Sequence, residues 1–304
     1  MVKSATHPLP TDRTSSSPLA PIGVAAALAE RTEKPRPRIW DEFALKDRVG
    51  LVSGANRGLG LEMALALVEA GARRVYCVDL PETPGEEWQA VRDYAREMDA
   101  EGKERLAYVS ANVTDQERMW EVGREIGETE GRMDVCVAAA GVLKSHTGCL
   151  EYPAAQFRQV MDINANGVLF TAQAAGREMA RFGNGGSIVL IASMSGSITN
   201  RDHAWVSYNA SKSAVLQMGR SMACELGPKR IRVNTLSPGH IYTSMTAAYL
   251  DTQPHLLEKW SSMNPLGRLG RPDELRGAIT WLASDASSFC TGSDILVSGG
   301  HHAW

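Results

Sequence analysis

Short apolar runs alternate with longer amphipathic stretches along the chain from Asp47 onward. Runs of this length, bounded by turn-forming or charged residues, indicate strands, and the mixed stretches between them have a helical period. The apolar runs predict seven strands: Val49–Ser53, Arg74–Asp79, Arg105–Ala111, Met133–Ala139, Ser187–Ala192, Ile231–Leu236 and Asp294–Val297. The amphipathic stretches predict helices near residues 59–71, 85–101, 115–130, 154–182, 206–227 and 272–284.

The regular alternation of strand and helix predicts the fold class. Strands that are apolar on both faces are typical of a parallel sheet covered by helices on both sides. Because crossovers between parallel strands are right-handed, we expect an α/β fold with a single doubly wound Rossmann-type domain of about seven strands. No break separates two such units, so the prediction is one domain over residues 41–304.

The segment 1–40 differs in composition from the rest of the chain. Thr11–Pro21 is rich in Ser, Thr and Pro, and Lys34–Arg38 is basic and interrupted by proline. This composition buries too little apolar surface to order itself, so we expect residues 1–40 to be a flexible extension. A transit peptide is the alternative. Such peptides avoid acids, whereas this segment has three: Asp12, Glu30 and Glu33.

The composition is that of an ordinary globular chain: 304 residues, 43% of them hydrophobic and 22% charged. A net charge of −3 gives no reason to expect nucleic acid or an anionic membrane as a partner. No apolar stretch is long enough to suggest a membrane span. The five cysteines have no metal-ligand spacing, which favours reduced thiols in a cytoplasmic protein and no metal site.

A glycine-rich loop follows the first predicted strand. Gly54, Gly58 and Gly60 let backbone amides approach a pyrophosphate at a helix N-terminus, where the helix dipole also favours an anion. The spacing G-x-x-x-G-x-G differs from the usual G-x-G-x-x-G dinucleotide fingerprint. Because a glycine-rich turn can also be merely structural, the loop alone leaves nucleotide binding open.

Asp79 closes the second predicted strand, downstream of Gly60. A carboxylate in this place can accept hydrogen bonds from an adenosine ribose and repel a 2′-phosphate, which favours NAD. Arg57 in the glycine loop argues the other way, since a guanidinium can pair with a 2′-phosphate. The sequence therefore favours NAD as cofactor and leaves NADP possible.

Three residues in the second half of the chain, Ser193, Tyr208 and Lys212, are candidate catalytic residues. Tyr208 and Lys212 are four residues apart and share one face of a predicted helix, where a nearby cation lowers the pKa of a phenol. A phenol of lowered pKa can exchange a proton with an alcohol oxygen. Ser193 ends a strand at the carboxyl edge of the sheet, where its hydroxyl can hold the same oxygen. Ser195 is the alternative serine.

Asn164 lies inside the long predicted helix 154–182, where asparagine has a poor intrinsic preference. Such a residue can kink a helix and hold a water molecule that links Lys212 to solvent. Asn166 competes for the same role.

These residues together resemble the short-chain dehydrogenase/reductase family over Leu45–Trp304, which is most of the chain. The resemblance rests on the segments Ser53-Gly-Ala-Asn-Arg-Gly-Leu-Gly60, Tyr208-Asn-Ala-Ser-Lys212, Arg232-Val-Asn234 and Pro238-Gly239, together with Asn164 and Ser193. It implies a dinucleotide-binding and catalytic domain in which Tyr208 is the acid/base and Ser193 polarises the carbonyl. Lys212 would bind the nicotinamide ribose, and Asn164 would support a water relay.

The resemblance also implies a set of cofactor contacts. Beyond Asp79 and the catalytic Tyr208 and Lys212, these contacts would come from Gly54, Asn56, Arg57, Gly58, Leu59, Gly60, Asn112, Val113, Gly141, Pro238, Gly239, Ile241 and Thr243. Three departures weaken the match: Ala138-Ala-Ala-Gly141 replaces the family's Asn-Asn-Ala-Gly, Asn112 replaces the usual acid after the third strand, and Ser298-Gly-Gly300 replaces the family's Asp-Gly-Gly.

Within the family, Asp79–Pro84, Ser237–Thr243 and Ser284–Asp294 resemble fungal polyol dehydrogenases and ketose reductases. The resemblance implies an NAD(P)-dependent enzyme that interconverts a secondary alcohol and a ketone, with a polyol and a ketose as the expected pair. A ketone reductase of secondary metabolism, a cofactor-dependent cyclase or epimerase, and a non-catalytic nucleotide sensor remain as alternatives.

The expected partner is a small-molecule alcohol or ketone. The family resemblance implies a homotetramer or homodimer built on the helices near 154–182 and 206–227. The stretch from His240 to Gly267 suits a lid over the substrate. Residues 200–205, which include His203, are expected to border the pocket.

Overall fold

The computed structural model describes residues 22–28, 34–144, 147–243, 246–247, 250 and 255–304. The chain divides into two compact units, Met1–Asp41 and Glu42–Trp304. Helix α1 (Gly23–Leu28) belongs to the first unit and has no buried residue, and α2 (Ile39–Phe43) crosses the division. Most of the extension predicted for residues 1–40 lies outside the described residues, so its flexibility stays a prediction.

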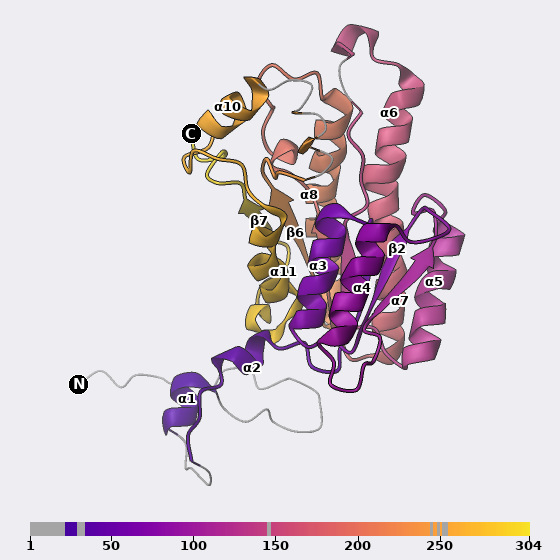
Figure 1. Cartoon of the computed structure of the whole chain (residues 1–304), viewed down its shortest axis with the longest axis vertical. Helices are drawn as coiled ribbons and strands as arrows, with labels where there is room; N and C mark the ends of the chain where they lie inside the picture. Colours follow the sequence, from indigo (N-terminus) through magenta and orange to yellow (C-terminus); the bar gives the residue numbers. More distant parts are fainter. Residues whose placement is uncertain (1–21, 29–33, 145–146, 244–245, 248–249, 251–254) are drawn as a thin grey trace, which may run out of the picture. The chain divides into compact units, whose positions relative to one another are not determined.

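The second unit contains the seven predicted strands, joined in one parallel sheet (Figure 1). Their order in the sheet is β3-β2-β1-β4-β5-β6-β7. The strands are β1 (Val49–Ser53), β2 (Arg74–Asp79), β3 (Leu106–Ser110), β4 (Val135–Ala138), β5 (Gly186–Ile191), β6 (Ile231–Pro238) and β7 (Asp294–Val297). The predicted fold class, an α/β doubly wound sheet, is confirmed.

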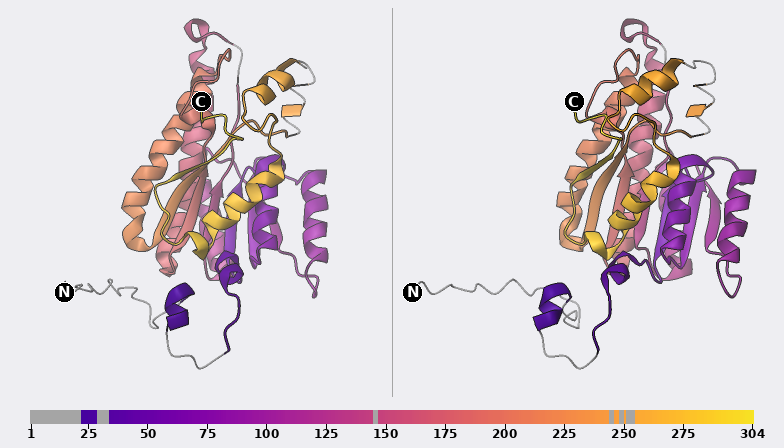
Figure 2. Two further views of the ribbon diagram at one scale, coloured as in Figure 1. Left: turned by 90° about the vertical axis from the view of Figure 1, so that its left-hand side faces the viewer. Right: turned by 60° about the vertical axis from the view of Figure 1, so that its left-hand side comes forward.

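Helices cover both faces of the sheet, as the two views of Figure 2 show. Buried residues of α5, α7 and α8 share one hydrophobic cluster with the sheet, and those of α3, α4 and α11 share the other. Strand β1 faces both clusters, since Leu51 packs into the first and Val52 into the second. These helices are α3 (Gly58–Glu69), α4 (Glu86–Glu97), α5 (Gln116–Glu130), α7 (Gly167–Phe182), α8 (Val206–Leu226) and α11 (Arg276–Ala283).

Two predicted helices differ from the observed ones. The single helix expected over 154–182 is divided into α6 (Ala154–Met161), a π-helical segment (Asp162–Asn166) and α7. The helix expected over 272–284 begins with a 3₁₀ turn, Pro272–Leu275, and continues as α11 from Arg276. A further helix, α10 (His255–Ser262), lies in the region for which no regular element was assigned.

The topological switch point of the sheet lies between the neighbouring strands β1 and β4. Strands β2 and β3 extend the sheet on one side of β1, and β4 to β7 extend it on the other. Ser53 at the carboxyl end of β1 is in register with Val78 and with Ala138. Doubly wound sheets bind ligands in the crevice at such a switch point, so the fold brings the glycine loop to the expected place.

Candidate active site

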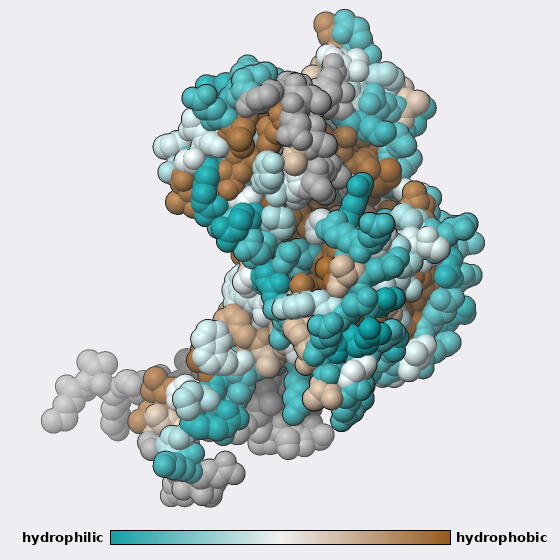
Figure 3. Space-filling model, in the orientation of Figure 1, coloured by the Kyte–Doolittle hydropathy of each residue, from teal (hydrophilic) through white to brown (hydrophobic). Residues whose placement is uncertain are grey.

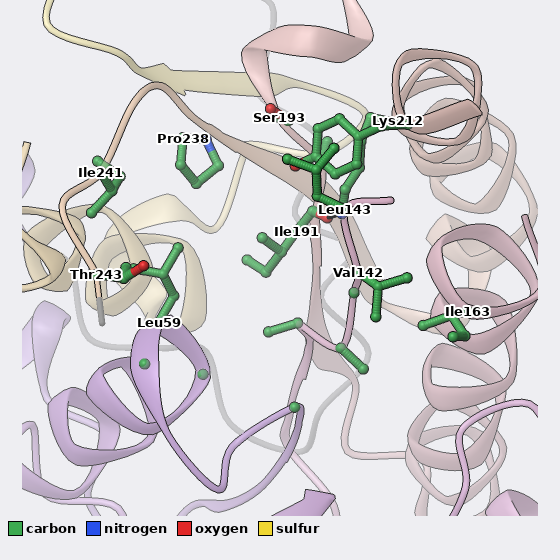
Figure 4. A pocket seen from close by; sticks show the side chains of 18 of the residues that line it. Leu59, Val142, Leu143, Ile163, Ile191, Ser193, Lys212, Pro238, Ile241 and Thr243 are labelled. Carbon is green, nitrogen blue, oxygen red and sulfur yellow. Dashed lines mark hydrogen bonds between the residues drawn. The ribbon is translucent and has the colours of Figure 1, made fainter. Parts of the chain in front are cut away.

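A cavity of about 760 Å³ opens at the carboxyl ends of the strands. Its lining comes from the segments that follow β1 to β6 and from α8 and α10. Every predicted site residue lines this cavity except Asn56 and Asn164. In Figure 4, Leu59 and Thr243 lie on one side of the cavity, and Val142 and Ile163 lie on the other.

The glycine loop can fold only with glycine at its key positions. Gly54 has a φ of 67°, and a Cβ there would lie 2.7 Å from the backbone of Ala140. A Cβ on Gly60 would clash with the carbonyl oxygen of Gly54. Since Arg57, the N-cap of α3, makes no side-chain cap hydrogen bond, the start of α3 is suited to an anion such as a pyrophosphate.

Asp79 is held at the edge of the cavity by backbone amides. Its carboxylate accepts hydrogen bonds from the amides of Asn56, at 2.9 Å, and Leu80, at 2.8 Å. The Asn56 side chain points elsewhere, because its Oδ1 accepts a hydrogen bond from the Gly85 amide. Asn56 therefore supports the loop through its backbone and does not line the cavity, unlike the expectation of a direct cofactor contact.

Two charged groups flank Asp79. Arg57 is exposed and lines the cavity, and it forms no ion pair with any residue that the structure describes. Glu87, from the first turn of α4, accepts a hydrogen bond from the Gly58 amide at 3.3 Å. The loop that would face an adenosine ribose therefore combines two carboxylates with one guanidinium.

The three candidate catalytic side chains meet at the opposite end of the cavity. Ser193 follows β5, Tyr208 lies in the first turn of α8 and Lys212 lies one turn further along, and all three line the cavity. Ser193 also accepts a hydrogen bond from the Ser195 amide at 3.2 Å, so Ser195 orients Ser193 through its backbone. Ser193 and Lys212 are both almost fully buried.

The expected acidity of Tyr208 is not present in this structure. Burial raises the pKa of the phenol, and the hydrogen bond from Ser193 offsets only part of this rise. The Lys212 ammonium lies 5.8 Å from the centroid of the Tyr208 ring and donates a 2.8 Å hydrogen bond to the Ile191 carbonyl. Burial lowers the pKa of Lys212 itself to about 8. The prediction of a lowered phenol pKa is therefore wrong for this structure, because desolvation of the buried phenol dominates.

Asn164 lies in the π-helical segment and is fully buried. Its amide pairs with both backbone groups of Val142, accepting from the amide at 2.8 Å and donating to the carbonyl at 2.9 Å, and also donates to Ser211 Oγ. Asn166 is exposed and bonds only Asp162 among the residues described. The helix distortion therefore serves Asn164, which fixes the loop after β4 against α8.

Aromatic residues close the substrate end of the cavity. Figure 3 shows apolar side chains gathered between α10 and α6. Trp205 lies 6.1 Å from Tyr208 and 6.4 Å from Trp260, measured between ring centroids, and Trp260 stacks on His240 at 4.2 Å. Sequence reasoning gave no role to His240, although its place directly after Pro238-Gly239 puts it beside the expected nicotinamide contacts.

The expected lid, His240–Gly267, is described only in part. Residues 244–245, 248–249 and 251–254 lie outside the described residues. In the part that is described, Leu250, Leu256 and Trp260 are buried and cluster with Trp205. His203, expected at the pocket border, accepts a 3.0 Å hydrogen bond from the Trp260 indole and stacks on Trp205.

The chain as described contains no cluster of three or more His, Cys, Asp or Glu side chains arranged to hold a metal ion. None of its described helices is both long and apolar enough to cross a membrane. The cysteines in this part of the chain are free thiols.

Comparison with known proteins agrees with this geometry. Residues 54–302 match a family model described as enoyl-(acyl carrier protein) reductase. A short chain dehydrogenases/reductase of Aspergillus versicolor is 39% identical over 269 residues, which cover 86% of this chain and 89% of that protein. Sorbose reductase of Schizosaccharomyces pombe is 40% identical over 261 residues, or 85% of this chain and 97% of that protein.

Solved structures are also similar. A gluconate 5-dehydrogenase of Burkholderia cenocepacia, in complex with NADP and tartrate, superposes with a TM-score of 0.78 at 29% identity, covering 87% of this chain and 99% of that chain. Carveol dehydrogenase of Mycobacterium avium, in complex with NAD, gives a TM-score of 0.77 at 27% identity, covering 86% and 99% respectively.

Proposed function

The chain belongs to the short-chain dehydrogenase/reductase family, and from that premise we propose that it interconverts a polyol and a ketose with Tyr208 as the proton-transfer group. It is an NAD(P)-dependent oxidoreductase that acts on secondary alcohols and ketones. The polyol assignment is supported by relatives named sorbose reductase, galactitol 2-dehydrogenase and D-arabinitol 2-dehydrogenase.

The chemistry follows from the positions of three side chains. When bound, the nicotinamide would supply hydride to the carbonyl carbon in reduction and accept it from the carbinol carbon in oxidation. Ser193 would hold the substrate oxygen by a hydrogen bond, and Tyr208, which lines the same cavity, would give that oxygen a proton in reduction. In oxidation the proton returns to Tyr208. Lys212 would hold the nicotinamide ribose, and Asn164 would keep the loop after β4 in place through its bonds to Val142.

The observation that carries the proposal is that Ser193, Tyr208 and Lys212 line the same cavity as the glycine loop. Replacing Tyr208 with Phe removes the hydroxyl and keeps the ring. We expect kcat to fall by a factor of about 10²–10⁴ or more, with the cofactor Kd nearly unchanged. Tyr94→Phe, on the exposed side of α4, is the matched control and should leave both constants unchanged.

Steady-state kinetics with a panel of polyols and ketoses, followed by absorbance of the reduced nicotinamide, measures this. Substantial turnover by Tyr208→Phe would contradict the mechanism. Cofactor-dependent conversion of a substrate without any change in this absorbance would favour a cyclase or epimerase instead.

We propose NAD as the preferred cofactor. Asp79 and Glu87 present two carboxylates at the glycine loop, where a 2′-phosphate would meet their negative charge, and Arg57 alone would attract it. Among the solved relatives, two are bound to NADP and one to NAD, so the proposal rests on these side chains.

We also propose that the chain forms a homotetramer or homodimer and that it is located in the cytoplasm. Exposed apolar side chains near the C-terminus, Phe289, Leu296 and Trp304, are suited to burial between subunits, and the free thiols suit a reducing compartment. Light scattering of the purified chain tests the assembly, which a monomer at micromolar concentration would rule out. Microscopy of a fluorescent fusion tests the location, and signal confined to an organelle would contradict it.

A further inference from the structure

The rings beside Tyr208 form a continuous surface along the substrate end of the cavity. We call Trp205, Trp260 and His240 the aromatic wall, since all three line the cavity and contact one another in this order. His240 is its most distant member from Tyr208 along the chain of ring contacts. The wall therefore extends from the reacting group toward a part of the substrate that does not react.

The aromatic wall is well fixed. His240 stacks on Trp260 with an interplanar angle of 5°, and the His301 ring packs against its edge at 5.3 Å. His301 is in turn bonded to Asn264 at 3.0 Å, and Trp260 donates to His203. A ring clamped in this way presents its nitrogen atoms in one orientation, which suits recognition of a ligand group.

The His240 nitrogens have no hydrogen-bond partner in the part of the chain that the structure describes, although the ring lies among apolar surfaces. Burial, with smaller contributions from the neighbouring imidazoles of His301 and His203, lowers the pKa of His240 to about 3. The ring is therefore neutral near pH 7 and has one N–H donor and one nitrogen acceptor. A hydroxyl group, which both donates and accepts, matches this pair.

The other two members of the aromatic wall, Trp205 and Trp260, can pack against the carbon chain that carries such a hydroxyl. The indole faces of Trp205 and Trp260 offer apolar surface for C–H groups.

We propose that His240 binds a hydroxyl of the substrate away from the reacting carbon, and thereby selects an open-chain polyol or ketose over an apolar alcohol or ketone. This inference rests on the proposed function, because it assigns the substrate class to the same cavity. It makes His240 a specificity residue for the reaction that Tyr208 performs.

Replacing His240 with Phe tests the inference. Phenylalanine keeps a planar ring for stacking on Trp260 and removes both nitrogens. We expect kcat/KM for a ketose such as sorbose or xylulose to fall about 5- to 100-fold, while kcat/KM for cyclohexanone stays the same or rises. His240→Asn keeps a donor and an acceptor and should recover part of the ketose activity. His255→Phe, the same change at an exposed position of α10, is the matched control and should alter neither value.

The other outcomes separate the inference from the proposed function. An equal fall for both substrates in His240→Phe would mean a structural role, and an unchanged ketose constant would mean no contact; either overturns the inference alone. In His240→Phe, the cofactor Kd could rise by the same factor by which kcat/KM for the ketose falls. That result would mean that His240 contacts the cofactor, and it would also overturn the inference. If the wild-type enzyme reduces cyclohexanone but none of the ketoses, both the proposed function and the inference fail.

Discussion

Tyr208 shows how the surroundings of one residue can reverse an expectation drawn from spacing. The i, i+4 relation with Lys212 correctly predicts that both side chains line one cavity. It does not predict that the lysine bonds the Ile191 carbonyl, or that burial raises the phenol pKa, because desolvation depends on residues from several separate segments.

The raised pKa of Tyr208 predicts opposite pH behaviour for the two directions of reaction. Reduction needs the protonated phenol, which is the dominant form at every pH below about 10, so its kcat/KM should be nearly flat from pH 6 to 9. Oxidation needs the phenolate, whose population rises about tenfold per pH unit below the pKa, so its kcat/KM should climb across this range. Initial rates at saturating cofactor measure both profiles. An oxidation profile that reaches its plateau near pH 7 would contradict the raised pKa, since it would require an acidic phenol.

Site residues that belong to short sequence motifs could be predicted, and those brought together only by tertiary packing could not. The predicted site residues in the glycine loop and the Tyr-x-x-x-Lys pair belong to short motifs, and among these described residues only Asn56 does not line the cavity. His240 and Trp260 meet only through the path of the segment between β6 and α10. No periodicity or motif in the sequence encodes that path.

At the scale of elements, the π-helical segment is the clearest departure from the predicted pattern. Asn164 was expected to disturb a continuous helix, and the backbone does widen at Asp162–Asn166. The sequence could not specify a π-helix, because the driving contacts are with Val142 and Ser211, 22 and 47 residues away. A distorted turn is favoured here since it lets Asn164 bond three buried or part-buried polar groups at once.

Replacing Asn164 with Ala should therefore destabilise the protein by about 1–3 kcal/mol, because it leaves two part-buried backbone groups of Val142 without these partners. Asn166→Ala is the matched control: it removes one exposed side-chain hydrogen bond and should change stability by less than about 0.5 kcal/mol. Urea denaturation of both variants measures the difference. Equal stability of the two variants would show that the Asn164 contacts do not hold the loop after β4 in place.

At the scale of the whole molecule, topology explains why distant segments form one site. The doubly wound sheet could be predicted from alternating strands and helices with right-handed crossovers, whereas the order of its strands is seen only in the structure. The switch between β1 and β4 then aligns the ends of β1, β2 and β4, which brings Gly54, Asp79 and Gly141 to one cavity. The region from 240 to 267 was harder to predict, since its helix α10 packs by aromatic contacts that leave no regular pattern in the sequence.

Cofactor choice is also a property of the whole molecule, because a ligand that binds only the folded state raises its stability. At a hundred times its Kd, a cofactor adds about 2.7 kcal/mol to the free energy of unfolding. With Asp79 and Glu87 at the loop, NAD should raise the melting temperature more than NADP does at equal concentration. Asp79→Ser should reduce or reverse this difference, since it removes one charge that repels a 2′-phosphate.

Asp79 also accepts two backbone hydrogen bonds, so its replacement lowers the melting temperature of the protein without cofactor. The quantity to compare between variants is therefore the rise in melting temperature when each cofactor is added. Asp93→Ser on α4, which removes a carboxylate outside the cavity, should keep the preference for NAD. Arg57 is the one group at the loop, among those described, that would favour NADP. If NADP stabilised the wild-type protein more than NAD, its guanidinium would outweigh both carboxylates, and Arg57→Ala should then abolish the preference for NADP.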